Sequence, residues 1–400
     1  MPPDGLLSPF IAFLHVISRA AKIGHRVILL RSLKWCHKTG RKGEFSMTEE
    51  ERKARQAHAF DISNSIVPRL AANGLEEVDD GLPMQEFVKV APLRTRIMAM
   101  PASDVITICS NAEYACNKNM FHLDEEGTRR FLRDISDVRK IAVSKVRTAD
   151  ALWTITDAAT KSPFMLQNKH SVMIFTEKWL ADDAVRFYAE NQLRTTFAVT
   201  EIPGNDIIRF LGDAAYVKGA QSFLINDGDY ASLTARADEV IARPDFSDVP
   251  PIQRPVTNPE LFRAIAELEQ EACWQATYDG KEKVLNELEN SMIATFADAR
   301  LLVPVKGLGQ VLKKGGKIII PSLSNGEILA TPAFTDWNEF SKVYSKDEWG
   351  GWIWRLDDLI SAPDGRIVIN AGSLGFRMEK SSLQRIAGIL HQDSEAAGKS

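Results

Sequence analysis

A chain of 400 residues is long enough for two or three domains with buried cores, since domains typically span about 100 to 200 residues. Its 44% hydrophobic and 26% charged residues are those of a globular protein, which excludes wholesale disorder and a small disulfide-stapled scaffold. The net charge of −4 excludes a whole-chain basic field that would attract nucleic acid.

The first 46 residues differ in charge from the rest of the chain. Residues 1–46 carry eight Lys or Arg against two acidic residues, although acids are in excess overall. The next segment begins Met47-Thr48 and continues with three glutamates, which is typical of a capped helix start. This break favours a true start at Met47 and an unpacked leader before it. The alternative is that residues 6–35 form a basic amphipathic arm for a membrane or nucleic acid.

Neither export nor membrane insertion is expected. The apolar stretch 6–17 is shorter than the roughly 20 residues that cross a bilayer, and no basic residue precedes it. The four cysteines form no CxxC pair, so we expect reduced thiols, although a disulfide between Cys109 and Cys116 is conceivable. These features predict a cytoplasmic protein.

A proline-rich linker divides the chain after its middle. Residues 243–259 contain five of the 18 prolines, which is typical of a domain boundary. The α/β segment after it, 260–392, is followed by a short tail, 393–400. Its periodicity predicts helices at 259–276 and 281–299, strands at 301–305, 317–323 and 328–334, a helix capped by Thr335, a strand at 352–356, a helix at 357–361, a strand at 366–370 and a helix at 379–390.

The α/β segment before the linker, 125–242, is predicted to have the same element order. We expect a helix at 125–137, strands at 140–146, 152–156 and 172–175, a helix capped by Thr176, a strand at 195–202, a helix at 206–218 and a strand at 222–226. The region 47–124 echoes part of this order as a possible degenerate partial repeat, with a helix at 61–73 and strands at 86–90, 96–100 and 105–110.

Two short sequence motifs occur in both α/β segments at equivalent positions. They are Phe175-Thr176 and Phe334-Thr335 after the third strand, and Ile225-Asn226 and Ile369-Asn370 after the last strand. Shared element order with shared markers predicts a tandem repeat. The predicted fold class is therefore α/β (α+β), with two similar units, each a mixed β-sheet with flanking helices in the order αβββαβαβ.

Five phrases of the second segment are characteristic of a known family. They occupy residues 258–260, 299–305, 332–340, 357–360 and 366–370. On these phrases the segment resembles the SseB family, which is linked to enhanced serine sensitivity, and residues 125–240 resemble it more distantly. The family usually has a proline where this chain has Ala371. The resemblance implies a compact α/β domain without a known catalytic centre, and it supplies no substrate.

Searches for catalytic and cofactor motifs yield none. No phosphate-binding loop or dinucleotide fingerprint is present, and the seven histidines show no metal-ligand spacing. Ser373 lacks the first glycine of a nucleophile elbow, because Ala371 stands there. The acid pairs Asp182-Asp183 and Asp357-Asp358 fall on predicted helices, where solvated faces are expected. We therefore predict no catalytic residue, cofactor or metal.

One concentration of aromatic residues is a candidate interaction surface. Four of the eight tryptophans fall between positions 337 and 354, and the surface candidates are Trp349, Trp352 and Trp354. Trp352 and Trp354 should share a strand face and pack as core. Trp349 precedes two glycines and is expected to be the exposed anchor.

The sequence thus predicts a non-enzymatic SseB-like protein acting as a protein-interaction or regulatory module. Its partner is an unknown protein. Nucleic acid is not expected as a partner, and a membrane is not expected unless residues 1–46 are retained. The alternative is a hydrolase or transferase with an unrecognised site between the two α/β segments, where pockets preferentially form.

Overall fold

The computed structural model describes residues 48–76, 92–167, 169–228, 231–250, 253–306, 318–325 and 328–397. The leader 1–46 and the strand predicted at 86–90 lie outside the described residues. By compactness the chain divides into two units, which are described separately. The helical unit holds the described residues up to Val146 together with Asn226–Leu233, and the α/β unit holds those of Arg147–Ile225 and Thr234–Ser400.

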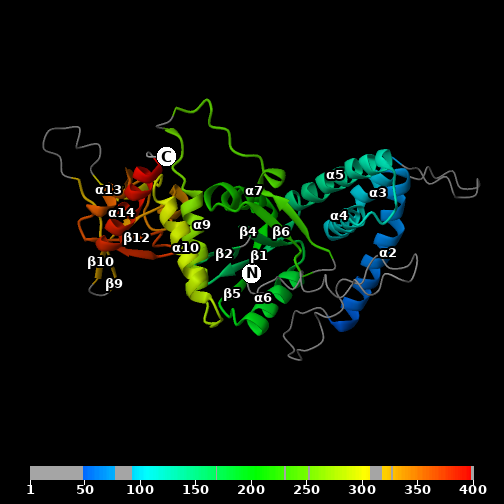
Figure 1. Cartoon of the computed structure of the whole chain (residues 1–400), viewed down its shortest axis with the longest axis horizontal. Helices are drawn as coiled ribbons and strands as arrows, with labels where there is room; N and C mark the ends of the chain where they lie inside the picture. The colour runs from blue at the N-terminus through cyan, green and yellow to red at the C-terminus, as the bar shows by residue number, and fades with distance from the viewer. Residues whose placement is uncertain are drawn as a thin grey trace, which may run out of the picture. The chain divides into compact units, whose positions relative to one another are not determined.

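The described part of the helical unit consists of helices with short connections. Its first helix starts with a capping box: the Thr48 hydroxyl accepts the N–H of Glu51 at 3.2 Å, and the Glu51 carboxylate accepts the N–H of Thr48 at 2.6 Å. This confirms the predicted helix start at Thr48. The helices are α2 (Glu49–Asn73), α3 (Leu93–Ala99), α4 (Ala102–Asn117) and α5 (Glu125–Arg147) (Figure 1).

Two predicted strands of the 47–124 region are helices, so the partial repeat predicted there is wrong. Residues 96–100 fall largely in α3 and residues 105–110 in α4. Helix α4 is buried on nearly all sides, so its apolar residues form a continuous run with no helical stripe. Short apolar runs of this kind do not distinguish a buried strand from a buried helix. Cys109 and Cys116 lie on α4, and neither forms a disulfide.

The strand predicted at 140–146 is also wrong, because α5 continues through it. The buried side chains Phe131, Ile135, Val138, Ala142 and Val146 recur every three or four residues along α5. One apolar stripe therefore runs through the whole helix. The β-branched residues near its end follow the helical period.

The α/β unit begins with a mixed β-sheet, which we call the first sheet. Its strands are β1 (Ala151–Asp157), β2 (Ser162–Pro163), β3 (Met165–Leu166), β4 (Ser171–Phe175), β5 (Phe197–Pro203), β6 (Ser222–Ile225) and β7 (Leu233–Arg236). Helix α6 (Lys178–Gln192) joins β4 to β5. The connection from β5 to β6 is η3 (Gly204–Asp206), α7 (Ile207–Gly212) and the π-turn η4 (Asp213–Val217), and α8 (Ala237–Val240) follows β7.

The strands of the second half make a second mixed sheet. They are β8 (Leu301–Val305), β9 (Leu323–Asn325), β10 (Ile328–Ala333), β11 (Gly350–Trp354), β12 (Arg366–Ile369) and β13 (Phe376–Glu379). Two hydrogen bonds between Leu302 and Phe334 join β8 to the end of β10. The helices are α9 (Pro259–Ala272), α10 (Lys281–Thr295), α12 (Trp337–Ser341), α13 (Leu356–Ile360) and α14 (Lys380–Ala397).

The two sheets have the same strand order and directions. In the first, β1 is antiparallel to both β5 and β4, and β4 is parallel to β6. In the second, β8 is antiparallel to β11 and to the end of β10, and β10 is parallel to β12. Phe175 and Phe334 occupy the same point of this order. So do Asn226 and Asn370, which follow the parallel strand with φ of 56° and 53°.

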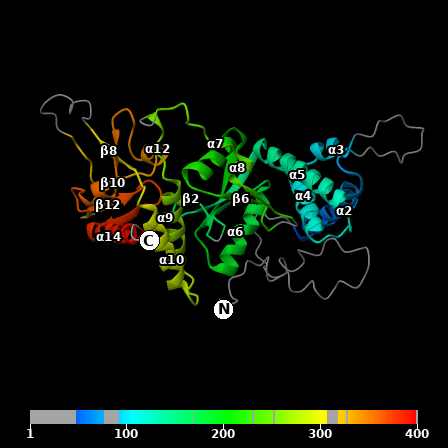
Figure 2. The same cartoon turned by 45° about the horizontal axis from the view of Figure 1, so that its top comes forward.

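Helices cover both faces of the second sheet. Leu301 and Val303 of β8 face a large core shared with α9, α10 and α14, whereas Leu302 between them faces a smaller cluster with Phe340 after the start of α12. This alternation is the strand period of two. Figure 2 shows α12 and α14 on opposite sides of β10 and β12.

Helix α9 is buried on both of its faces. One face contributes Leu261, Phe262 and Ile265 to the core of the second sheet. The opposite face carries Glu267, Gln270 and Glu271, none more than 2% exposed. Buried polar groups must be hydrogen-bonded, so this face needs specific partners.

Those partners come from the first sheet and the chain next to it. Gln270 accepts the N–H of Met165 at 3.1 Å and donates to the carbonyl of Pro163 at 3.2 Å. Glu267 lies 2.7 Å from Nδ1 of His170. Burial raises the pKa of the Glu267 carboxyl, while the His170 contact opposes that shift. We call this set of contacts the α9 seam; it joins the two sheets of the α/β unit.

The seam also contains a buried ion pair. The Arg194 guanidinium lies 3.3 Å from Glu271 and stacks over the ring of Trp274, 4.1 Å from its centroid. Glu271 also accepts hydrogen bonds from Gln167 at 3.0 Å and from Tyr278 at 2.8 Å. Burial lowers the pKa of Arg194, and the negative charge of Glu271 opposes this shift.

We expect Glu271→Ala to destabilise the protein by about 3 to 5 kcal/mol, because it leaves the buried Arg194 charge without its anion. Adding Arg194→Met should recover much of this loss. Urea unfolding followed by tryptophan fluorescence measures both. Seven of the eight tryptophans lie in the α/β unit, so the signal reports mainly on that unit.

The matched control is Glu287→Ala, which breaks the exposed Lys283–Glu287 pair and should cost less than about 0.5 kcal/mol. A Glu271→Ala variant as stable as this control would contradict the expectation. So would a double variant no more stable than the single one.

Candidate functional site

The three candidate tryptophans differ in exposure. Trp354 is 6% exposed and belongs to the large core, as predicted. Trp352 is 42% exposed, although it was expected to be core, and its ring meets that of Trp354 edge-on at 6.0 Å. Trp349, the expected anchor, is half-buried between Tyr344, at 5.1 Å between ring centroids, and Lys306. Of the three tryptophans, Trp352 is therefore the exposed one.

Strand β11 combines Trp352 with a second exposed apolar residue. Ile353 is 47% exposed and, as the next residue of the strand, points to the opposite face. Both faces of the strand are therefore apolar at this point. We call Gly351, Trp352 and Ile353 the β11 edge.

The backbone of the β11 edge is available for pairing. Ile353 lies opposite Leu302 in the register, and both backbone groups of Leu302 are bonded to Phe334, at 2.8 and 2.9 Å. Opposite residues of this kind form a non-hydrogen-bonded pair. The N–H and C=O of Ile353, and by alternation those of Gly351, therefore point away from β8. In the described chain no further strand pairs with this side of β11.

Strand β5 is the counterpart of β11 in the first sheet. The register places Thr200, Glu201 and Ile202 at the positions of Trp352, Ile353 and Trp354, respectively. Ile202 is 4% exposed, as Trp354 is buried, so the inward position is apolar in both strands. The two solvent-exposed positions are polar in β5, with Thr200 and Glu201, and apolar in β11, with Trp352 and Ile353.

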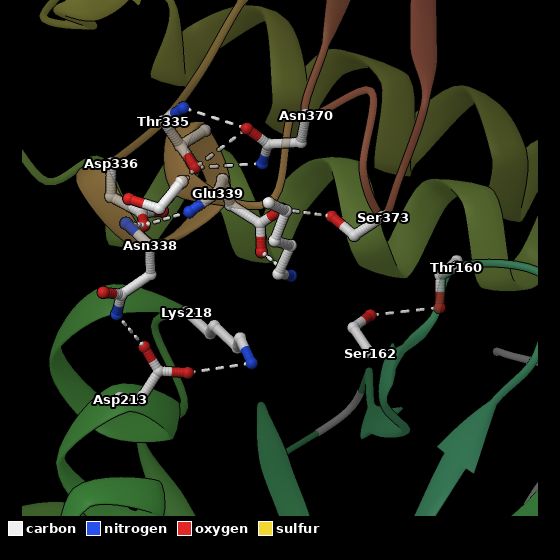
Figure 3. A network of polar contacts seen from close by, with 12 residues as sticks. Thr160, Ser162, Asp213, Lys218, Thr335, Asp336, Asn338, Glu339, Asn370 and Ser373 are labelled. Carbon is white, nitrogen blue, oxygen red and sulfur yellow. Dashed lines mark hydrogen bonds and ion pairs between the residues drawn. The ribbon is translucent and has the colours of Figure 1, made fainter. Parts of the chain in front are cut away.

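A second cluster lies at the carboxyl ends of the parallel strands β10 and β12, where α/β proteins commonly bind ligands. There the Asn370 side chain accepts the N–H of Thr335 at 3.0 Å and donates to its hydroxyl at 2.9 Å (Figure 3). Asp336 is the N-cap of α12 and accepts the N–H groups of Asn338 and Glu339 at 2.8 and 3.0 Å. Burial raises the pKa of the Asp336 carboxyl.

Both threonine caps predicted from the sequence are wrong. The N-cap of α12 is Asp336, one residue after Thr335, and the N-cap of α6 is Glu177, one residue after Thr176. Thr335 instead holds Asn370, whose left-handed backbone turns the chain after β12. A carboxylate accepts two amide N–H groups better than a hydroxyl does, which explains the shift in α12.

The remaining acids of this cluster are paired with neighbouring side chains. Glu339, 1% exposed, accepts the Ser373 hydroxyl at 2.5 Å and lies 2.5 Å from the Lys342 ammonium. Asp213 on η4 accepts the Asn338 amide at 2.8 Å and pairs with Lys218 at 2.8 Å (Figure 3). The cluster therefore ties η4 to α12, and its polar groups are bonded to one another, which is the pattern of a structural network.

The cluster also contains Ser373, which follows Asn370 in the turn after β12. Its side chain is buried, and its donor is directed at Glu339. Within the described residues, no group of three or more His, Cys, Asp or Glu side chains is placed to hold a metal ion. Asp183, expected on a solvated face, is instead buried and paired with Arg186 at 2.7 Å.

The comparisons with known proteins leave the family open. Neither family models, nor curated proteins, nor solved structures match this chain. The resemblance to the SseB family therefore stays a prediction. Among the described residues no helix is both long and apolar enough to cross a membrane.

We expect Trp349→Ala to act on stability. Its ring closes the cluster of Phe334, Phe340 and Tyr344, so removal should cost about 2 to 4 kcal/mol, measured by urea unfolding. A loss below about 0.5 kcal/mol would show that the ring is dispensable for packing.

The raised pKa of Asp336 predicts a signed pH effect. In the folded protein the pKa lies above its unfolded value near 3.8, so the carboxyl contributes its full stability below that value. The contribution is lost as the pH rises through the folded pKa. The advantage of wild type over Asp336→Asn should therefore shrink as the pH rises from about 3.5 to 7.

The measurement is the free energy of unfolding of both proteins across that range. Asp357→Asn, on the exposed first turn of α13, controls for the removal of one acidic residue. An advantage of wild type that grows with pH would contradict the assignment of burial as the dominant influence on Asp336.

Proposed function

We propose that this chain is a non-enzymatic, cytoplasmic protein-interaction module that binds an extended segment of a partner protein along the β11 edge. The observation that carries the proposal is the pairing of an open strand edge with two exposed apolar side chains, Trp352 and Ile353. A partner strand would bond the outward backbone groups of Gly351 and Ile353.

The lack of edge protection supports this proposal. Natural sheets usually protect open edges with charged residues, bulges or covering elements, because an unpaired edge invites association. Glu201 provides a charge of this kind on β5, whereas Ile353 holds the equivalent place on β11. Two strands with the same place in their sheets thus differ at the positions that a partner would touch.

The tryptophan supplies the anchor expected of a binding hot spot. Its ring rests edge-on against the buried Trp354, which limits its freedom before binding. A rigid, partly exposed indole loses little conformational entropy when covered, and tryptophan is enriched among hot-spot residues. The complementary segment should therefore be extended and carry an apolar side chain facing Trp352.

The matching order of the two sheets supports a further part of the proposal, that the α/β unit arose as a tandem repeat. On this view the second copy is SseB-like and has acquired the binding edge, while the first copy keeps a protected edge. The α9 seam then holds the two copies together as one scaffold.

The test transplants the β5 residues into β11 as Trp352→Thr/Ile353→Glu. A photo-crosslinking residue at position 353 first captures the partner, and the crosslinked segment is then made as a peptide. We expect the double variant to bind this peptide at least about thirtyfold more weakly, equivalent to about 2 kcal/mol. Its unfolding midpoint should change little, because both side chains are exposed.

The matched control is Thr200→Ala/Glu201→Ala on β5, which should leave peptide binding unchanged. Equal loss of binding in both variants would contradict a role specific to β11. So would unaltered binding in the Trp352→Thr/Ile353→Glu variant.

A further inference from the structure

A groove lies beside β13, on the opposite side of the second sheet from α12. Its volume is about 350 Å³, within the range of small-molecule sites. Its walls come from α9, α10, β13 and α14. The apolar part of the lining is Leu268, Leu285, Met292, Phe376, Met378 and Ile386.

The polar part of the lining comes from α10, with Asn286 and Glu289, and from α14, with Ser382 and Arg385. Ser382 and Arg385 are three residues apart, so they lie on one face of the helix. Arg385 pairs through one terminal nitrogen with Glu289 of α10, and a guanidinium has further donors to offer. Arg377 of β13 lies at the border of the lining, but its strand neighbours Phe376 and Met378 face the core, so its side chain points to the other face of the sheet. Arg385 is therefore the cation that faces the groove, and Glu289 occupies only one of its terminal nitrogens.

The geometry points to a binding site for a soluble amphipathic carboxylate, with its hydrocarbon chain on the apolar floor and its carboxylate at Ser382 and Arg385. Charge complementarity selects an anion over a cation or a neutral molecule. The apolar floor selects an alkyl chain over a small anion. This site uses no residue of the β11 edge, so the two proposals stand or fall separately.

Substitutions at the two members of the Arg385–Glu289 pair should change the affinity for the anion in opposite directions. Arg385→Gln removes the anion's partner, whereas Glu289→Gln removes a competing carboxylate and frees the guanidinium. Both variants break the same ion pair, so any effect on helix packing is common to them. Titration calorimetry with decanoate should show saturable binding, weakened at least about tenfold by Arg385→Gln and strengthened by Glu289→Gln.

Two further comparisons test separately whether binding depends on the alkyl chain and on the carboxylate of decanoate. Decyltrimethylammonium, with the same tail and a positive head, should not bind at decanoate concentrations that saturate. Leu285→Trp places a larger ring in the groove and should block decanoate while circular dichroism shows a folded protein. Absence of saturable decanoate binding up to about 1 mM would overturn the proposal. So would shifts of the same sign in the Arg385 and Glu289 variants.

Discussion

The structure of the α/β unit depends on the burial of helix α9 on both faces. An amphipathic helix normally leaves its polar face to water, yet Glu267, Gln270 and Glu271 are covered by the first sheet. Such groups are tolerated only when each finds a partner, and a partly satisfied set would be worse than an apolar surface. Because each of these polar groups needs its partner, the position of α9 against β3 is fixed. The position of one sheet relative to the other within this unit is fixed with it.

The start of α9 is also fixed by hydrogen bonds of a buried polar side chain. Asn258 precedes the proline at the first helical position, but its side chain does not cap the helix. It accepts the N–H of Arg300 and donates to the carbonyls of Arg300 and Thr335. Thr335 in turn holds Asn370. One polar chain thus connects the helix start, the beginning of β8 and the carboxyl ends of β10 and β12.

The cluster at the carboxyl ends of β10 and β12 and the β11 edge differ in how many of their polar groups are already hydrogen-bonded. The cluster around Asp336 and Glu339 has carboxylates, a lysine and a serine, and these groups are bonded to one another or to the backbone. The β11 edge has the opposite character, because backbone groups and apolar side chains stay uncovered there. The proposed interaction at the β11 edge rests on this unused bonding capacity and not on reactive residue types.

Local signals determined the Thr48 capping box, the start of α9 after Asn258, the central strands β1, β4, β8 and β12, and the buried position of Trp354. Each follows from hydrophobic period or turn chemistry within a few residues. Only the tertiary structure decided that residues 105–110 are helical, since a helix covered on all sides loses its polar stripe. It also decided that Trp352 is exposed while Trp349 is covered. Exposure depends on which strand lies at the edge of a sheet, and strand pairing between segments distant in the sequence sets that position.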